Sequence, residues 1–328
     1  MKAVVEVKKL RRYFKIHQKQ PGLLGSIKSF FSRKYRQVKA VDNISFSLQK
    51  GELVGFIGPN GAGKTTTLKS LSGLLYPSDG SISVLGFNPW QRQSDFLKQI
   101  ALVMGQKNQL WWDLPAMETF LLNKEIYEIP DEQFKKTLKE LTGLLEVSDL
   151  LSIQVRKLSL GERMKCELIA ALLHSPQVLF LDEPTIGLDV VMQKKMRDFI
   201  KEYNKRHEAT ILLTSHYMGD VAELCQRVII IDKGKIVFDG NLKEIVKKYS
   251  DHKRISVILA KEVDPKKLEG FGEIIKYSYP QLVFSVKRRQ TSIVTAQILD
   301  KLPVADLNVE EPAIQDIIRK LFTGKNYA

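Results

Sequence analysis

The sequence predicts an α/β protein with a parallel sheet, a helical subdomain that interrupts it and a small α+β domain towards the C-terminus. Between residues 40 and 240, short apolar runs alternate with helix-forming runs, which is typical of parallel strands connected by helices. Between Trp111 and Ser175 the apolar residues recur at helical spacing instead. From about Arg254 the pattern returns to short strand-like runs, so a second, smaller domain is expected there.

The predicted parallel sheet takes its strands from short apolar runs. The first, over residues 53–58, is followed directly by a predicted helix over residues 64–74. Three more strands are predicted over residues 178–182, 211–215 and 227–232. The helical subdomain, expected over about residues 107–175, is indicated by Phe120, Leu121, Ile126, Leu138, Leu141, Leu144 and Leu145.

The C-terminal region alternates between strand-like and helix-like runs. RISVILA, EIIKYSY, QLVFSVK and ADLNVE predict strands, whereas TSIVTAQILDKL and PAIQDIIRKLF predict helices. The expected order, β-α-β-β-α-β-α, suits a small appended α+β domain. The chain is therefore expected to divide into a domain over residues 1–240, a linker helix over 241–253 and an accessory domain over 254–328.

Composition places the chain among ordinary globular proteins. Hydrophobic residues make up 44% and charged residues 27% of the chain, so neither a disordered nor a collagen-like protein is indicated. No run approaches the roughly 18 apolar residues of a membrane-spanning helix, and the N-terminal residues become charged too early for a signal peptide. Cys166 and Cys225 lack a metal-like spacing and are expected to be buried thiols. We therefore expect a cytoplasmic protein that joins a membrane only as a peripheral subunit.

The net charge of +14 is concentrated near the N-terminus, where residues 1–40 hold 12 Lys or Arg and one acidic residue, Glu6. Such a cluster favours an anionic membrane surface, a solvated face or nucleic acid, and the sequence leaves all three open. The segment 15–37 includes a predicted amphipathic helix that either lies on lipid headgroups or packs on its own domain. Its apolar face comprises Leu23, Leu24, Ile27, Phe30 and Phe31, with Lys28, Arg33 and Lys34 around it.

The strongest local signal is GPNGAGKTT, which directly follows the apolar strand ELVGFI and precedes a helix-forming run. Glycines in such a loop let successive N–H groups point at phosphate oxygens, and the next helix directs its positive end at the same anion. Lys64 supplies a charge for the β and γ phosphates, Thr65 a hydroxyl for Mg²⁺ and Thr66 a bond to phosphate. This motif alone leaves kinases, GTPases and ATPases open. The predicted nucleotide-binding residues are Gly58, Pro59, Asn60, Gly61, Ala62, Gly63, Lys64, Thr65 and Thr66.

A second signal is the apolar run VLFLDEP, which ends in two adjacent carboxylates. A parallel strand of this kind ends beside the phosphate loop, where Asp182 is placed to hold Mg²⁺ through water. Glu183, one residue further, is placed to polarise the attacking water as general base. His216 follows the run TILLTS, where a neutral imidazole is placed to bond the γ phosphate. These side chains predict that the bound nucleotide is hydrolysed.

The run KLSLGERMKCELIAALL lies shortly before the acidic strand and resembles the signature of ABC ATPases, which is LSGGQ followed by a helix. Ser159 and Gly161 match that signature, whereas Leu160 replaces its middle glycine and Glu162 its glutamine. Over residues 2–240 the chain is similar to the ATP-binding subunits of ABC transporters. The resemblance implies a P-loop NTPase fold in which two subunits enclose two ATP molecules, and Ser159 and Gly161 act on the nucleotide of the partner subunit.

The same resemblance implies the cofactors ATP and Mg²⁺ and further site residues. Gln106 looks like the glutamine that reaches Mg²⁺ and the attacking water, with Gln109 as the alternative. Asp189, in IGLDV, matches the loop that crosses the dimer interface and is expected to contact nucleotide there.

Aromatic side chains carry two more expectations from the resemblance. Tyr13 looks like the side chain that stacks on adenine, with Phe14 and Tyr35 as alternatives. Trp111 and Trp112 lie where the family docks short cytoplasmic helices of its transmembrane partner, and an exposed aromatic pair suits such an interface. Burial of both tryptophans within the helical subdomain is the alternative.

The resemblance implies an exporter motor in which ATP closes a dimer, most simply a homodimer, and hydrolysis by Glu183 reopens it. Its partners are then separate transmembrane permease subunits, and its place is the cytoplasmic face of the cell membrane. Residues 254–328 resemble the small domain that follows the ATPase in exporter subunits for drugs, lipids or polysaccharides. The alternative is a soluble ABC ATPase that acts on ribosomes or nucleic acid, but such proteins commonly carry two cassettes or long coiled coils, which this chain lacks. No specific nucleic-acid partner is therefore expected.

Overall fold

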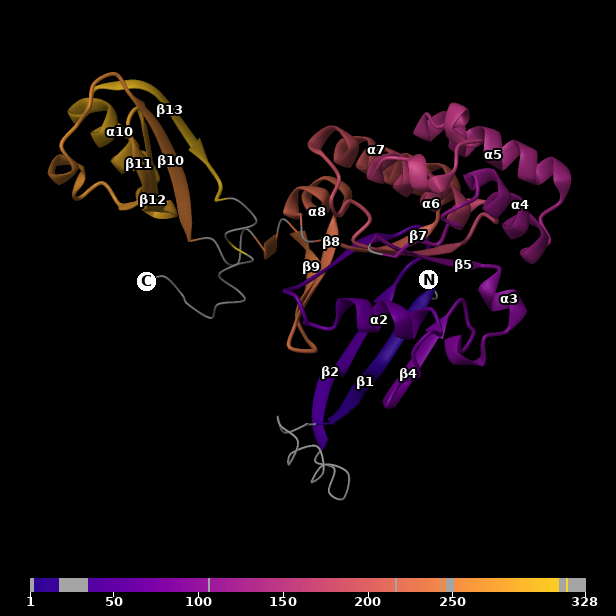
Figure 1. The fold of residues 1–328 in the computed structure, drawn as a ribbon. Helices are drawn as coiled ribbons and strands as arrows, with labels where there is room; N and C mark the ends of the chain where they lie inside the picture. Colours follow the sequence, from indigo (N-terminus) through magenta and orange to yellow (C-terminus); the bar gives the residue numbers. More distant parts are fainter. Residues whose placement is uncertain are drawn as a thin grey trace, which may run out of the picture. The chain divides into compact units, whose positions relative to one another are not determined.

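The chain forms two compact units, Met1–Asp239 and Gly240–Ala328, each with its own hydrophobic core (Figure 1). The computed structural model describes residues 3–17, 35–105, 107–215, 217–242, 244–245, 251–312 and 317. Both units combine sheets with helices, so the predicted α/β fold class with a smaller α+β part is confirmed.

A six-stranded sheet forms the centre of the first unit, in the order β5-β6-β7-β3-β8-β9. The pairs β5–β6, β6–β7, β3–β7 and β3–β8 are parallel, so the carboxyl ends of these strands lie at one edge of the sheet. Every residue of β6 and β7 is buried, as expected for parallel strands covered on both faces. The strands are β3 (Leu53–Ile57), β5 (Ile100–Met104), β6 (Val178–Asp182), β7 (Thr210–Thr214), β8 (Arg227–Asp232) and β9 (Lys235–Asn241).

A three-stranded antiparallel sheet, in the order β2-β1-β4, shares the core of the first unit and was not among the predicted elements. It consists of β1 (Val5–His17), β2 (Tyr35–Leu48) and β4 (Asp79–Val84). β1 and β2 remain paired as far as His17 and Tyr35, so both strands run into the segment 15–37. The apolar face predicted for a helix in that segment lies outside the described residues.

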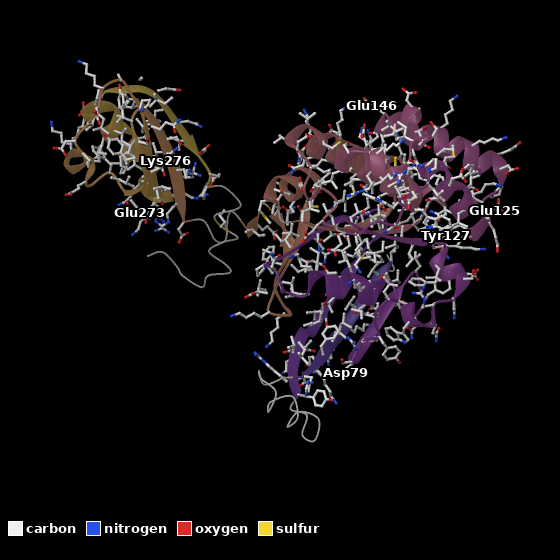
Figure 2. All side chains as sticks on the ribbon, viewed as in Figure 1. Asp79, Glu125, Tyr127, Glu146, Glu273 and Lys276 are labelled. Carbon is white, nitrogen blue, oxygen red and sulfur yellow. The ribbon has the colours of Figure 1, made fainter. Side chains whose placement is uncertain are left out.

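Helices complete the first unit. α2 (Lys64–Leu71), α3 (Ser94–Leu97), α7 (Val190–His207) and α8 (Met218–Leu224) accompany the large sheet. The segment predicted to be helical contains α4 (Ala116–Ile126), α5 (Asp131–Leu145) and α6 (Leu160–Leu172), and α6 contacts both other helices and β5. Tyr127, at the C-terminal end of α4, stacks on His174 with 4.0 Å between the ring centroids (Figure 2). This contact holds α4 near the end of α6.

The second unit is a four-stranded antiparallel sheet, in the order β11-β12-β10-β13, with α10 (Thr291–Lys301) packed on it. The strands are β10 (His252–Leu259), β11 (Glu273–Ser278), β12 (Gln281–Lys287) and β13 (Val304–Glu310). The helix expected between the first two strands of this unit, β10 and β11, is a 3₁₀ turn, Pro265–Leu268. Of the final predicted helix residues 312 and 317 are described, and residue 317 is helical; of the predicted linker helix residues 242, 244 and 245 are helical.

Two expectations from composition concern burial and hydropathy. Cys166 and Cys225 are free and buried as predicted, and burial raises the pKa of both thiols, that of Cys166 to about 12. Neither is therefore a reactive thiolate near neutral pH. Among the described residues, no helix has the length and apolar character needed to cross a bilayer.

Candidate nucleotide site

The glycine-rich loop joins the end of β3 to the start of α2, as predicted for a phosphate-binding loop. Gly63 has a φ of 110°, and a Cβ at this position would lie 2.3 Å from the carbonyl oxygen of Ala40 in β2. Only glycine therefore fits without moving β2. The Ala62 N–H donates to the Pro59 carbonyl at 3.1 Å and closes the turn. The loop thus has a defined shape that depends on both sheets.

Lys64, the first residue of α2, is buried within this loop. Its Nζ donates to the carbonyl oxygens of Gly58 at 2.7 Å and Pro59 at 3.2 Å. Burial lowers the pKa of the ammonium group, and the negative charges of Glu183 and Asp182 oppose that effect. An anion beside the loop would offset the cost of keeping this charge buried.

Asp182, the last residue of β6, is linked to the start of α2 and to the end of β7. Its Oδ2 accepts a hydrogen bond from the Thr65 hydroxyl at 2.7 Å, and its Oδ1 accepts one from the Thr214 hydroxyl at 2.7 Å. Because β3, β6 and β7 are parallel, the phosphate loop, the acidic strand end and Thr214 meet at one edge of the sheet. Thr65 and Asp182 contribute hydroxyl and carboxylate oxygens, the ligand type that Mg²⁺ prefers.

Glu183 follows Asp182 with a φ of 56°, in the left-handed region. A non-glycine residue costs about 1–3 kcal/mol there, and such positions cluster at functional sites. Its N–H donates to the Thr214 carbonyl at 3.1 Å and hydroxyl at 3.0 Å. On its other side, a Cβ added to Gly105 would lie 2.2 Å from the Glu183 carbonyl oxygen. The backbone at the predicted base is therefore fixed by β7 and by the end of β5.

The signature residues form the N-terminal end of α6. Ser159 is the N-cap: its hydroxyl accepts the Glu162 N–H at 3.3 Å, and Glu162 Oε2 accepts the Ser159 N–H and hydroxyl at 2.8 Å each. This reciprocal capping box gives Glu162 a structural role, and its negative charge makes both bonds stronger than those to a neutral glutamine oxygen. Leu160 packs over Gly187, where an added Cβ would lie 2.9 Å from the leucine Cδ2. Ser159 is exposed, so the end of α6 that it caps faces solvent.

Gly161, in the first turn of α6, lies against the start of α7, whose N-cap is Asp189. A Cβ on Gly161 would lie 3.0 Å from Cγ of Met192, and the Asp189 Oδ1 accepts the Met192 N–H at 2.8 Å as the N-cap of α7. Within one chain Gly161 lets α6 approach Met192 of α7, and Asp189 caps α7. The nucleotide contacts predicted for Gly161 and Asp189 across a dimer stay predictions.

Tyr13 lies on β1 opposite Lys39 of β2. Its hydroxyl donates to Asp42 Oδ1 at 2.6 Å, and the Lys39 ammonium lies 5.5 Å from the ring centroid. Lys39 directly precedes Ala40, the residue that packs against Gly63, so the ring is near the phosphate loop. This placement is compatible with the adenine contact predicted for Tyr13.

The alternative aromatic residues have other partners. The Arg12 guanidinium lies 4.5 Å from the centroid of the Phe14 ring, and Tyr35 meets His17 edge-on at 5.7 Å. Tyr35 is the first residue of β2 and lies at the end of the β1–β2 pair, five residues before Ala40. Neither residue is paired beside the phosphate loop as Tyr13 is.

Gln106 and His216, two predicted catalytic residues, lie outside the described residues. Gln109, the alternative to Gln106, donates its side-chain amide to the Leu102 carbonyl of β5 at 2.9 Å. Its backbone N–H donates to the carboxylate of Glu167 on α6. Gln109 is therefore engaged by β5 and α6 in this chain.

A buried carboxylate on α8 connects the segments that contain Glu183 and His216. Asp220 is 2% exposed, and its Oδ2 accepts hydrogen bonds from the hydroxyls of Thr185 and Ser215, at 2.5 and 2.9 Å. Its Oδ1 accepts a bond from Arg197 of α7 at 2.9 Å. A residue close to each predicted hydrolysis residue is thus attached to the buried Asp220 carboxylate. Thr185 is close to Glu183, and Ser215 is next to His216.

Asp220→Asn is expected to lower the free energy of unfolding by about 3–5 kcal/mol, because it leaves the mostly buried Arg197 without its inner partner. Glu223→Gln removes the outer, 41% exposed partner of the same arginine and is the control, with an expected cost of about 1 kcal/mol or less. Urea unfolding of both variants measures the difference. If both variants lost the same free energy of unfolding, the buried Asp220 would stabilise the protein no more than a surface charge does.

Trp111 and Trp112 are 55% and 47% exposed, so the alternative of burial within the helical subdomain is wrong. The Arg163 guanidinium lies 5.4 Å from the centroid of the Trp112 ring. Leu121, Leu122 and Ile126 of α4 are also exposed. An exposed aromatic pair is typical of a protein interface.

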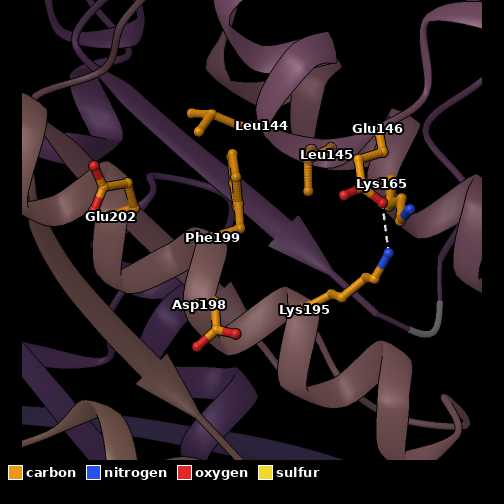
Figure 3. A pocket seen from close by; sticks show the side chains of 8 residues that line it. All are labelled: Leu144, Leu145, Glu146, Lys165, Lys195, Asp198, Phe199 and Glu202. Carbon is orange, nitrogen blue, oxygen red and sulfur yellow. Dashed lines mark hydrogen bonds and ion pairs between the residues drawn. The ribbon is translucent and has the colours of Figure 1, made fainter.

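A pocket of about 360 Å³ lies between α5, α6 and α7 (Figure 3). Lys195 pairs across it with Glu146, at the C-terminal end of α5. Lys165 is buried at its wall, and burial lowers the pKa of its ammonium group. Acidic side chains, Asp198 and Glu202, line the same space. The mixed charges give this pocket no preference for an anionic nucleotide, so the strand ends remain the candidate nucleotide site.

Comparison with known proteins assigns the family. Residues 41–186 match the family model of the ABC transporter, and residues 251–310 match that of the EvrA-like ABC transporter, C-terminal domain. NatA of Bacillus subtilis (strain 168), an ABC transporter ATP-binding protein, is 35% identical over 66% of this chain and 87% of its own length. The chain belongs to the ABC transporter ATP-binding proteins. It is accordingly an ATPase.

Other relatives of this ABC transporter ATP-binding protein extend the comparison to both units. BcrA of Bacillus licheniformis, a bacitracin transport ATP-binding protein, is 30% identical over 89% of this chain and 95% of its own length. A solved ATP-binding subunit of an ABC transporter superposes with a TM-score of 0.63, at 25% identity, over 75% of this chain and 93% of its own. A dimeric ATP-binding cassette in a post-hydrolysis state shares the fold, with a TM-score of 0.60 at 21% identity.

Three residues of the site were missed from the sequence. Thr214, which accepts from Glu183 and donates to Asp182, lies within the predicted strand 211–215 and is the last residue of β7, and its position beside Ser215 and His216 was the available signal. Asp220 and Glu167 are buried carboxylates whose partners come from distant parts of the chain. A single acidic residue within a helix gives no sign of such partners.

Proposed function

We propose that this ATPase powers an exporter whose transmembrane permease subunits are separate chains, and that it works as a homodimer at the cytoplasmic face of the membrane. The observation that carries the proposal is the similarity to BcrA, a transport ATP-binding protein, over nearly the full length of both chains. That match includes the second unit, which the family model of the EvrA-like C-terminal domain also covers. The direction of transport rests on the resemblance of this second unit to exporter subunits.

The chemistry proposed for the site follows from its residues. Lys64 and the N–H groups of the loop bind the β and γ phosphates, where the positive end of α2 adds to the field. Mg²⁺ fits beside Thr65 and Asp182, whose oxygens lie 2.7 Å apart, and when bound it would neutralise phosphate charge. Glu183 orients and deprotonates the attacking water. His216 is proposed to contact the γ phosphate from the segment after β7.

Dimer closure is the proposed mechanical step. The exposed N-terminal end of α6, with Ser159 and Gly161, supplies backbone N–H groups to the γ phosphate held by the other subunit. Val190 and Val191, 78% and 68% exposed beside Asp189, are apolar side chains that suit burial in such an interface. ATP then joins the subunits, and its hydrolysis removes the bridging phosphate and releases them.

Trp112→Ala is expected to leave the basal ATPase activity unchanged and to weaken permease binding by about 30-fold or more, as for an interface hot spot. Ile293→Ala truncates a side chain of the second unit that is 61% exposed, and serves as the control. Both variants are co-expressed with a candidate transmembrane permease, and co-purification and stimulated ATPase activity are measured. Unchanged stimulation in Trp112→Ala would reject the docking role.

Purification of the wild-type chain with that membrane protein tests the function as a whole. Stimulated ATPase activity in liposomes, together with export of a substrate, is the expected result. An ATPase that ignores every membrane partner and instead binds RNA with a steep salt dependence would favour action on ribosomes or nucleic acid.

A further inference from the structure

Glu167, in the middle of α6, is a buried carboxylate that the proposed chemistry does not use. It is 3% exposed. Its two oxygens accept the Gln109 N–H at 2.8 and 3.0 Å, and Oε1 also accepts the Leu110 N–H at 3.3 Å. Burial raises the pKa of this carboxyl, and the two backbone N–H groups oppose that effect. Its partners are therefore main-chain groups of the loop that follows β5.

That loop carries the exposed aromatic pair. Leu110 is directly followed by Trp111 and Trp112, so Glu167 holds the base of the pair on α6. A second contact with α6, a cation–π contact, comes from Arg163, one turn earlier on the helix, whose guanidinium lies 5.4 Å from the centroid of the Trp112 ring. Residues 109–112 are thus attached at two points to one helix. Bonds between N–H groups and an ionised carboxylate are among the stronger hydrogen bonds of proteins.

The helix that receives these contacts is the one capped by Ser159. Glu167 lies two turns after Ser159, about 12 Å along the axis at 1.5 Å per residue. A hydrogen-bonded helix of this length moves as a rigid rod, so a displacement at Glu167 is transmitted to the capped end. Glu167 therefore connects an exposed apolar surface to the signature residues through one element.

We propose that Glu167 is a positioning residue of the ATPase, which couples the segment 109–112 to the signature end of α6 so that the two shift together. The inference rests on the proposed function, since it requires Ser159 to meet a nucleotide and the tryptophans to meet a partner. In the absence of the carboxylate, the loop and the helix are expected to move independently. ATP binding would then no longer affect the segment 109–112, and that segment would no longer affect ATP binding.

The test uses hydrogen–deuterium exchange of the full-length chain, with and without a non-hydrolysable ATP analogue and Mg²⁺. In the wild type, the analogue is expected to slow exchange across residues 107–112. In Glu167→Gln, exchange at Gln109 and Leu110 is expected to be about tenfold faster, and the response to the analogue is expected to disappear. Affinity for the analogue is expected to stay within about twofold of the wild type, because Glu167 contacts none of the nucleotide-binding residues.

Glu118→Gln is the matched control, since Glu118 is an exposed glutamate on α4 in the same subdomain. It should behave as the wild type does. Glu167→Gln keeps the side-chain volume and one oxygen acceptor, so it decides the outcome even where Glu167→Ala does not fold. Thermal unfolding of each variant establishes that the compared proteins are folded.

Three outcomes would overturn the proposal. Faster exchange in Glu167→Gln with an intact response to the analogue would mean that the carboxylate only stabilises the loop. A wild-type chain that hydrolyses ATP but shows no response at residues 107–112 would also reject the coupling, while the proposed ATP-driven function would stand. A wild-type chain that fails to hydrolyse ATP with any membrane partner would reject the proposed function, and the inference with it.

Discussion

Glu183→Gln is expected to lower the rate of ATP hydrolysis by about 10²–10⁴-fold, because a neutral amide cannot take the proton of the attacking water. ATP binding should persist, since the phosphate loop, Lys64 and Asp182 are unchanged. With ATP trapped and Mg²⁺ present, the variant is expected to form a stable dimer. Single-turnover hydrolysis and size-exclusion chromatography with light scattering measure both effects.

The structure supplies a control for this variant. Glu132→Gln makes the same chemical change at an exposed glutamate on α5 and should leave hydrolysis and dimerisation as in the wild type. If Glu183→Gln hydrolysed ATP at the wild-type rate, Glu183 would not be the base. If the variant lost hydrolysis without forming a stable dimer, Glu183 would still be the general base. The proposal that two subunits enclose the ATP molecules would then be rejected.

Lys64→Met is expected to weaken ATP binding by about 10- to 100-fold, the cost of losing charge-assisted bonds to phosphate. Methionine keeps the apolar stem, so the loop should stay folded. Lys69→Ala, near the C-terminal end of the same helix, is the control for a general loss of positive charge from α2. Fluorescent-nucleotide titration gives the affinities. If both variants lost the same ATP affinity, Lys64 would contribute to binding only through the overall positive charge of α2.

The buried ammonium group also predicts a pH effect on stability. Because burial lowers the pKa of Lys64, the folded state binds this proton less tightly than the unfolded state does. The wild type should therefore gain stability relative to Lys64→Met as the pH rises above the pKa of Lys64 in the folded state, while at neutral pH the variant should be at least as stable. Urea unfolding without nucleotide at two pH values measures the difference.

The parallel sheet and the phosphate loop were predictable from the sequence because their signals are local. Apolar runs of strand length ended in glycine or in Asp182, and the glycines around Lys64 had the spacing that a phosphate loop requires. The helical subdomain was predictable for the same reason, since helical periodicity is visible within about a dozen residues. The structure places Thr65, Asp182 and Lys64 together, as parallel strand ends require.

The antiparallel sheet was missed because β1 alternates buried and exposed residues over only its first few positions, and basic residues follow. β2 and β4, the strands that pair with β1, are distant from β1 in the sequence, so this pairing depends on the whole fold. The contacts of Asp220 and Glu167 were missed for a related reason. A buried polar residue is recognised by its partners, and those of Glu167 lie in the loop after β5.

Substitutions in the signature could be interpreted only with the structure. Glu162 seemed to weaken the match to the family, but it completes the capping box with Ser159. Leu160, the other departure, packs on Gly187 in the loop before α7. Both residues stabilise the end of α6 within the chain, so the departures from the signature leave Ser159 in position.

A mixing experiment tests most directly whether each ATP site is built from two subunits. Lys64→Met inactivates the phosphate loop, and Ser159→Asp places a negative charge at the signature end while keeping a good N-cap residue. In a head-to-tail dimer of the two variants, one site combines an intact phosphate loop with an intact signature. Mixing two inactive proteins should therefore restore ATPase activity, whereas mixing Lys64→Met with Glu183→Gln, which damage the same half-site, should not. A mixture of Lys64→Met and Ser159→Asp that stays inactive although mixed dimers form would contradict the account.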